Sequence, residues 1–100
     1  MDERPFTETP DLGVYSSRRV VEDREPIRLV VHEEDGDWQF LAGGERRPDE
    51  IRYVHVSHVI EWEPAVRQLV DLPLGWIAWR ERPEDDWIRE PAPADEPGIE

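Results

Sequence analysis

Apolar and polar residues alternate along much of the chain, which is the pattern of half-buried β-strands rather than of long helices. Residues 27–32 follow this pattern and form a strand whose strongly apolar face is made of Ile27, Leu29 and Val31. Residues 33–37 contain an Asp-Gly step, and residues 38–41 alternate again with Trp38 and Phe40 on one face. Two such runs joined by an Asp-Gly turn predict a β-hairpin, the strongest local signal in the sequence.

Further segments extend the predicted sheet. Residues 14–21 are rich in β-branched and aromatic side chains and predict one or two short strands, and residues 51–56 predict another. Residues 76–80 predict the last main strand, whose two faces carry Trp76 and Ala78 on one side and Ile77 and Trp79 on the other. Trp87-Ile88 then predicts an edge strand or a clip onto the sheet.

Helical signals lie between residues 57 and 75. Ser57 is suited to cap a short helix that runs to Trp62. Pro64 interrupts this helix, because the residue before a proline avoids the helical region, and it suits the first position of a second helix. The apolar stripe of that second helix is Ala65, Val66, Leu69 and Val70. Together these elements predict an α+β fold, with a small, mostly antiparallel sheet of four to six strands and two short helices packed on one face.

The ends of the chain differ from this middle in composition. Residues 1–11 hold two prolines and four acids and predict a flexible arm, and residues 90–100 are Pro-rich and acidic and predict a disordered tail. Residues 12–89 then form one α+β domain. The N-terminus lacks the apolar run of a secretory signal, cysteine is absent, and no stretch approaches the roughly 18 apolar residues of a membrane span. We therefore expect a cytoplasmic protein.

The formal net charge of −13 is unevenly placed. Residues 1–11 carry four acids against one arginine and residues 81–100 carry eight against two, whereas residues 12–80 carry thirteen against nine. Such a chain repels nucleic acid and anionic membrane surfaces and attracts basic proteins. We therefore expect a protein partner, in particular a basic one, with no nucleic acid and no membrane.

Tryptophan is unusually frequent, with five in 100 residues. Each covers a large apolar area with few rotatable bonds, so most are expected in the core. Trp76 and Trp79 cannot face the same side of a regular strand, so one of them faces away from the helices. If the terminal segments leave that face uncovered, its aromatic patch is a candidate binding surface.

Histidines and aspartates are the candidates for metal chemistry. His55 and His58 form an H-x-x-H pair, and with His32 and either Asp35 or Asp37 they can supply metal ligands. A surface or capping role is the competing interpretation. Asp35-Gly36-Asp37 also has the oxygen ligands of a calcium loop but lacks its remaining positions, and a turn explains it. We expect no cofactor and no catalytic residue.

Other motifs are incomplete. Ser16-Ser17 lacks the surroundings of a nucleophile elbow, and Gly43-Gly44 lacks the remainder of a phosphate loop. Arg18-Arg19 and Arg46-Arg47 can pair with an anionic ligand, or alternatively balance acids close to them.

Three stretches resemble a family of small bacterial proteins, and they are Ser17-Arg18-Arg19-Val20, Asp35-Gly36-Asp37-Trp38-Gln39-Phe40 and Asp71-Leu72-Pro73-Leu74-Gly75-Trp76-Ile77-Ala78-Trp79-Arg80. This family was first known as a domain of unknown function and is classed as predicted immunity proteins of polymorphic toxin systems. The order of the stretches and the two-helix element before the Leu-Pro-x-Gly-Trp turn are also similar, over roughly residues 14–88. The resemblance implies an immunity role and carries over no catalytic residues.

The sequence therefore favours a non-enzymatic protein-binding module, and the resemblance implies an immunity-type inhibitor of a basic toxin domain. The predicted contacts are the acidic hairpin residues Glu34, Asp35 and Asp37, together with whichever of Trp76 and Trp79 is exposed. The alternative is a small metal-binding protein or metal-dependent enzyme that uses His32, His55 and His58. A scaffold component without a ligand of its own is a third interpretation.

Overall fold

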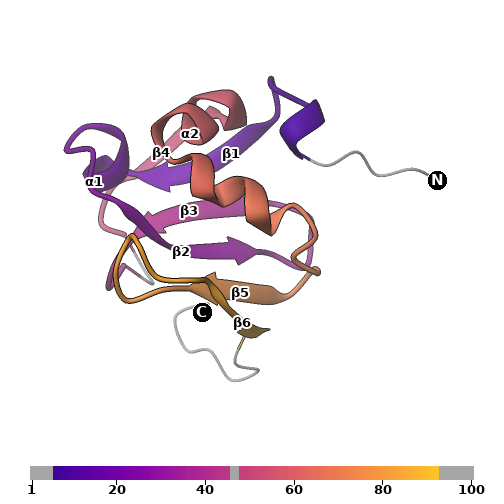
Figure 1. Ribbon diagram of the computed structural model, residues 1–100. Helices are drawn as coiled ribbons and strands as arrows, with labels where there is room; N and C mark the ends of the chain where they lie inside the picture. Colours follow the sequence, from indigo (N-terminus) through magenta and orange to yellow (C-terminus); the bar gives the residue numbers. More distant parts are fainter. Residues whose placement is uncertain (1–5, 46–47, 93–100) are drawn as a thin grey trace.

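The computed structural model describes residues 6–45 and 48–92 and shows one sheet with helices on one side (Figure 1). The 3₁₀-helix η1 (Phe6–Glu8) precedes β1 (Gly13–Ser17) and helix α1 (Arg18–Val21). The strands β2 (Ile27–His32), β3 (Trp38–Ala42) and β4 (Ile51–His55) follow. Helix α2 (Val56–Trp62), the 3₁₀-helix η2 (Pro64–Leu69), β5 (Trp76–Trp79) and β6 (Ile88–Pro91) complete the described chain.

The six strands lie in the order β4-β1-β3-β2-β5-β6. All neighbouring strands are antiparallel except β1 and β3, which are parallel and meet at Tyr15 and Gln39. The predicted hairpin is formed by β2 and β3, in which Val30 pairs with Phe40. The predicted α+β fold with a mostly antiparallel sheet is therefore confirmed.

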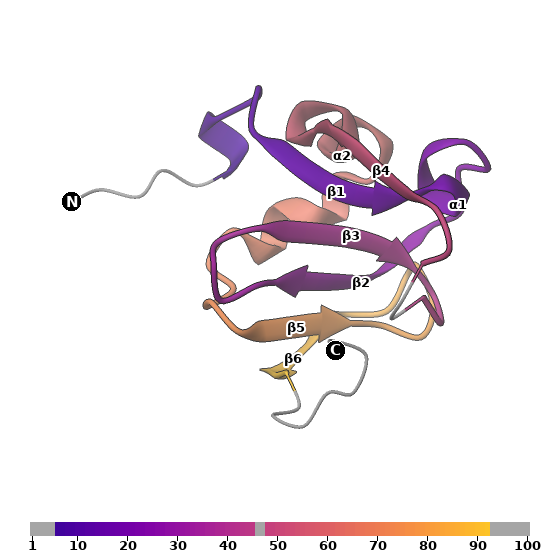
Figure 2. The same ribbon diagram turned by 180° about the vertical axis from the view of Figure 1, so that it is seen from behind.

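The helices cover one face of the sheet, and the view from behind shows the opposite face without a helix over it (Figures 1 and 2). The main core lies between the sheet and the helices, and its fully buried members include Val14, Val30, Phe40, Val56, Val59, Val66 and Leu69. None of the helices in the described part of the chain has the length and apolar character needed to cross a membrane.

The helix η1 closes one end of this core. The ring of Phe6 is buried and lies edge-on to the rings of Trp38 and Phe40, with centroid separations of 4.9 and 5.9 Å. Residues 6–8 are therefore packed onto the domain, which corrects the prediction that all of residues 1–11 form a flexible arm. One large aromatic side chain outweighs the polar residues around it, and residues 1–5 lie outside the described residues.

A β-bulge at Arg28 changes which side chains of β2 face the helices. The register with β3 shifts between Ile27 and Leu29, so Ile27 and Val30 both pack in the main core. A smaller cluster on the opposite face is made of Leu29, Leu41 and Ile77, with Val31 packed against it. The prediction that Ile27 shares a face with Leu29 and Val31 is wrong, because the extra residue of a bulge interrupts the alternation.

The structure corrects two further predictions, the extent of the strands over residues 14–21 and the start of the helix that ends at Trp62. Residues 18–21 form α1 instead of a strand, because the Ser17 hydroxyl accepts a hydrogen bond from Val20 N–H at 3.4 Å and caps the turn. Helix α2 begins at Val56 with His55 as its N-cap residue, so Ser57 lies inside the first turn. Pro64 does occupy the start of the next helix, which is the 3₁₀-helix η2.

The last described element is β6, which is the edge strand that we predicted at Trp87-Ile88. Glu90 and Pro91 pair with β5 in this strand, and Ala92 N–H donates to Gly75 O at 2.9 Å. Main-chain pairing therefore continues past residue 90, where the disordered tail was predicted to begin. Residues 93–100 lie outside the described residues.

An ion pair between the buried Arg80 and the partly exposed Glu63 joins the helical layer to the sheet. Arg80 follows β5, its side chain is 2% exposed, and its Nη2 lies 3.1 Å from Glu63 Oε2. The guanidinium also donates to Ile27 O and lies 4.1 Å from the centre of the Trp87 ring. Glu63 stands at the break between α2 and η2, and its other oxygen accepts from Ile27 N–H at 3.3 Å. One pair thus holds the start of β2, the end of β5 and the helix break together.

We expect Glu63→Ala to lower the free energy of unfolding by about 3 kcal/mol, because it leaves the buried Arg80 guanidinium without its carboxylate. Equilibrium unfolding in urea measures the change. Glu61→Ala, at an exposed position of α2, is the control and should stay within about 0.5 kcal/mol of the wild type. Equal losses in both variants would contradict the role of the pair.

Phe6→Ala should destabilise the protein by about 3–5 kcal/mol, because it opens a cavity against Trp38 and Phe40. The exposed neighbour Thr7 provides the control Thr7→Ala. Thermal and urea unfolding report the difference, and a Phe6→Ala variant as stable as the control would show that residues 6–8 do not contribute to the core.

Candidate functional site

The turn between β2 and β3 presents four carboxylates at one end of the sheet, and we call Glu33, Glu34, Asp35 and Asp37 the acidic tip. Glu33 N–H donates to Asp37 O at 2.8 Å, and Gly36 N–H donates to Glu33 O at 3.0 Å. Gly36 has a φ of 100°, which glycine adopts without strain. Asp35 Oδ1 accepts from Asp37 N–H at 3.1 Å, so this carboxylate shapes the turn that the sequence predicted.

A groove of about 680 Å³ lies beside the acidic tip, between the tip, the turn before β5 and the end of β6. Its lining includes Glu34, Asp35, Leu74, Gly75 and Trp76. Leu74 is 52% exposed although it is apolar, and Trp76 is half-buried against the main core. The groove therefore combines carboxylates with accessible apolar surface.

His32 links the two walls of the groove. Its Nδ1 lies 2.7 Å from Leu72 O, and since a carbonyl oxygen only accepts, Nδ1 carries a proton. The ring stacks on Trp38 with centroids 3.8 Å apart and 11° between the planes. Gly75 N–H donates to His32 O at 2.7 Å, so the hairpin and the turn before β5 hold fixed relative positions.

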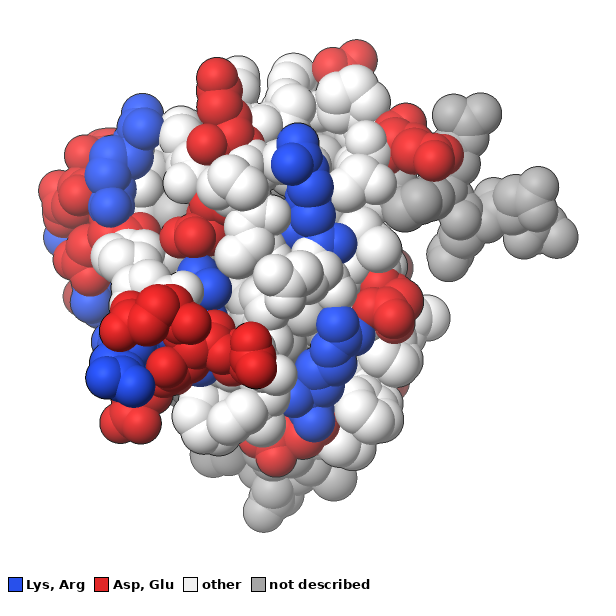
Figure 3. All heavy atoms as spheres, in the orientation of Figure 1, with Lys and Arg blue, Asp and Glu red and all other residues white. Residues whose placement is uncertain are grey.

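The acidic tip differs from other acidic regions in its pairing with the described residues. Among the described residues none of its carboxylates forms an ion pair, and Glu33 accepts a hydrogen bond from Gln39 Nε2 instead. Acids on the helix-bearing face gather along its left margin and over the loop between β5 and β6, where arginine lies among them (Figure 3). In that loop Arg82 Nη2 lies 3.3 Å from Asp85 Oδ1. The tip thus keeps its negative charge, whereas in the other acidic regions neighbouring arginines neutralise part of the charge.

Trp76 and Trp79 lie on opposite faces of β5, as the alternation predicts, and only Trp76 reaches the acidic tip. Trp79 is 36% exposed on the face without helices, and its Nε1 donates to Glu90 Oε2 at 2.8 Å. Trp76 is more buried but lines the groove. The more exposed tryptophan is therefore separate from the predicted acidic contacts.

The three histidines do not converge. His55 and His58 lie side by side where β4 meets α2, with ring centroids 6.0 Å apart. Strands β1 and β3 lie between β4 and β2, the strand that carries His32. Strands β4 and β2 are therefore three inter-strand spacings of about 4.8 Å apart. Within residues 6–45 and 48–92 no group of three or more His, Asp or Glu side chains is arranged to hold a metal ion. The predicted three-histidine alternative is therefore not assembled.

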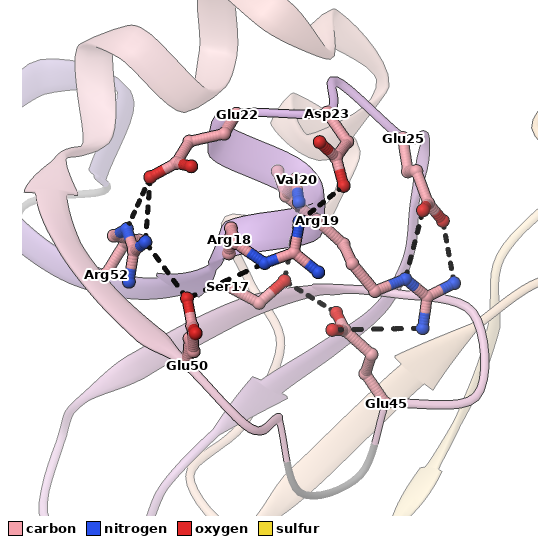
Figure 4. Close-up of polar contacts among 10 residues, drawn as sticks. All are labelled: Ser17, Arg18, Arg19, Val20, Glu22, Asp23, Glu25, Glu45, Glu50 and Arg52. Atoms are coloured by element: carbon pink, nitrogen blue, oxygen red, sulfur yellow. Dashed lines mark hydrogen bonds and ion pairs between the residues drawn. The ribbon is translucent and has the colours of Figure 1, made fainter.

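At the opposite end of the strands, arginines and acids pair around α1 (Figure 4). The closest pairs, each at 2.7 Å, are Arg18 with Asp23, Arg19 with Glu25 and Arg52 with Glu22. Arg18-Arg19 therefore balance nearby acids, the second of the two roles that the sequence left open. Arg46-Arg47 lie outside the described residues.

Glu45 connects this network to the end of β3. Its carboxylate is buried, and Oε1 accepts from Ser17 Oγ at 2.6 Å and from Ala42 N–H at 2.9 Å. Its Oε2 lies 3.8 Å from Arg19 Nη1. These bonds give the Ser17 hydroxyl and the Glu45 carboxylate a structural role at the end of β3.

Leu74 and Gly75 line the groove although the sequence did not single them out as site residues. Gly75 has a φ of 78°, and a Cβ at this position would lie 3.2 Å from Glu34 Cγ. Glycine is therefore required for Glu34 to pack against the turn. The available signal was the order Pro73-Leu74-Gly75, which places an apolar side chain at the apex of a turn, where it is hard to bury.

Comparison of the chain with protein-family models, with curated proteins and with solved structures finds no match in any of the three.

The network around α1 predicts a pH dependence of stability. Hydrogen bonds from Arg19 lower the pKa of Glu25 below its ordinary value of 4.5. A carboxyl whose pKa is lowered by folding stabilises the folded state above its unfolded pKa, and this contribution disappears as the pH falls through the folded value. Glu25→Gln should therefore lower Tm at pH 7, and its difference from the wild type should shrink below pH 4.5. Calorimetry across this pH range measures both Tm values, and a Tm difference that stays constant with pH would contradict the assignment.

Proposed function

We propose that this protein is a non-enzymatic binding module whose acidic tip and adjoining groove engage a basic protein. The observation that carries the proposal is the set of carboxylates at the tip that form no ion pair with a described residue, placed directly beside the apolar surface of Leu74 and Trp76. By contrast, the acids around α1 are largely paired with arginine.

The chemistry of the groove suits lysine and arginine side chains. Their aliphatic stems pack on apolar surface while their charged ends remain in polar surroundings. In this groove the stem lies against Leu74 or the edge of Trp76, and the cation reaches Glu34 or Asp35. The net charge of −13 adds long-range attraction, which raises the association rate for a basic partner at low salt.

The specific form that we propose is an immunity-type inhibitor of a basic toxin domain. Two observations support it, namely the resemblance over roughly residues 14–88 and the concentration of acids at one exposed turn. The metal-dependent alternative loses the arrangement on which it depended, because His32 lies on a different strand from His55 and is bonded to Leu72.

Charge reversal at the tip tests the proposal. The double variant Glu34→Lys and Asp37→Lys should slow association with the basic partner about tenfold or more and flatten its salt dependence, because steering by the tip is lost. Surface plasmon resonance at low and high salt measures both quantities. The binding protein to use is the product of an adjacent gene that is lethal unless this chain is co-expressed.

The matched control is Glu84→Lys with Asp86→Lys, which changes the net charge by the same amount at exposed positions in the loop between β5 and β6. The control should retain most of the association rate. Equal losses in the two double variants would show that total charge, and not the acidic tip, determines binding.

A further inference from the structure

The two edges of the sheet differ in how they are protected against pairing with another strand. The edge strand β6 carries Arg89, Glu90 and Pro91, residue types that discourage pairing. The edge strand β4 contains neither proline nor acid, and its exposed residues are Ile51 at 57%, Tyr53 at 66% and His55. A strand of this kind offers its free backbone groups to a partner strand.

The register of β4 shows which backbone groups are free. Arg18 N–H donates to Glu50 O at 3.0 Å, and Val56 N–H donates to Leu12 O at 2.8 Å. Hydrogen-bonded residues alternate in an antiparallel pair, so residues 50, 52, 54 and 56 direct their backbone groups toward β1. The N–H and C=O of Ile51 and Tyr53 therefore point away from β1, at a margin where no further strand is drawn (Figure 2). Ile51 O accepts from the exposed Arg52 Nη1 of its own strand at 3.3 Å, a bond that a partner strand replaces.

Charge makes this edge the place where two copies meet with least repulsion. Residues 12–21 and 51–60 are the longest stretches without Asp or Glu, at ten residues each. Strands β1 and β4 lie within these stretches and pair with each other. Two acids close to one end of β4, Glu22 and Glu50, are bonded to Arg52 at 2.7 and 3.2 Å.

We propose that β4 pairs antiparallel with β4 of a second copy, about a twofold axis at Tyr53, which joins the two sheets into one. Tyr53 then exchanges both backbone hydrogen bonds with its counterpart, Ile51 lies opposite His55, and Arg52 lies opposite Val54. No two like charges are directly opposite. Tyr15, whose ring centroid is 5.1 Å from that of Tyr53, extends the aromatic contact on the face without helices.

The size of the contact sets its strength. Stable dimers bury about 800 Å² on each partner, and a five-residue strand with two exposed apolar side chains supplies less. The dimer is therefore concentration-dependent. The remaining acids of the two copies repel one another, so salt strengthens the dimer, whereas salt weakens the proposed binding of a basic partner at the acidic tip. Failure of either proposal thus leaves the other testable.

Sedimentation equilibrium of the full chain over a range of concentrations tests the dimer. In about 0.5 M NaCl, where charges are screened beyond roughly 4–5 Å, the mass should rise from 11.8 kDa toward twice that value. Tyr53→Lys should raise the dissociation constant about tenfold or more, because it places two lysines directly opposite each other at the twofold axis. Ile51→Lys should also raise it, because it removes the apolar side chain that lies opposite His55. Ile88→Lys, at an exposed position of the other edge strand, is the control and should change it little.

Hydrogen exchange of the wild-type protein gives a second measurement that does not depend on a variant folding. The amides of Ile51 and Tyr53 should become protected as the protein concentration rises. A monomer at every concentration and salt, Lys variants that dimerise like the wild type, or freely exchanging Ile51 and Tyr53 amides at high concentration would each overturn the proposal. If the true partner of β4 is a strand of a different protein, this chain stays a monomer at every concentration and salt, which is the first of these outcomes.

Discussion

The ion pair between the buried Arg80 and Glu63 is the contact on which the arrangement of the layers depends. It acts on Ile27, which directly precedes the bulge at Arg28, because Ile27 N–H donates to Glu63 and Ile27 O accepts from Arg80. Buried backbone groups need partners, and here two side chains supply what the interrupted ladder does not. The same pair fixes the break between α2 and η2 over the sheet. Bulge and ion pair therefore form a single structural device.

The consequences of this device extend along β2 to the acidic tip. Beyond the bulge, Val30 faces the helices and Leu29 faces the opposite side, so His32 lies on the helix-bearing side and stacks on Trp38. The stacked His32 then bonds Leu72 and positions the turn that forms the groove. At the other end of the strands, Glu45 and the arginines around α1 neutralise one another. One end of the sheet is thus closed by paired charges, and the other presents unpaired ones.

Features determined by neighbouring residues could be predicted, and those determined by distant contacts could not. The Asp35-Gly36 turn, the opposite faces of Trp76 and Trp79 and the interruption at Pro64 follow from backbone preferences and strand geometry. Glu63 and Arg80 bond the backbone beside the bulge at Arg28, and Phe6 is buried against Trp38, and no local pattern contains these contacts. The acidic residues of the site were visible in the sequence, but the groove is formed by segments some forty residues apart.

The distribution of charge, more than its total, distinguishes the surfaces of this protein. A net charge of −13 alone predicts attraction to any basic molecule and repulsion between copies. Four carboxylates that form no ion pair with a described residue lie at the turn between β2 and β3, whereas the strands at the β4 edge contain no acid. Because β1 separates β3 from β4, contact along β4 leaves the hairpin tip uncovered. The proposed self-association and the proposed capture of a basic partner therefore involve different parts of one sheet, and in the proposed dimer both acidic tips stay accessible.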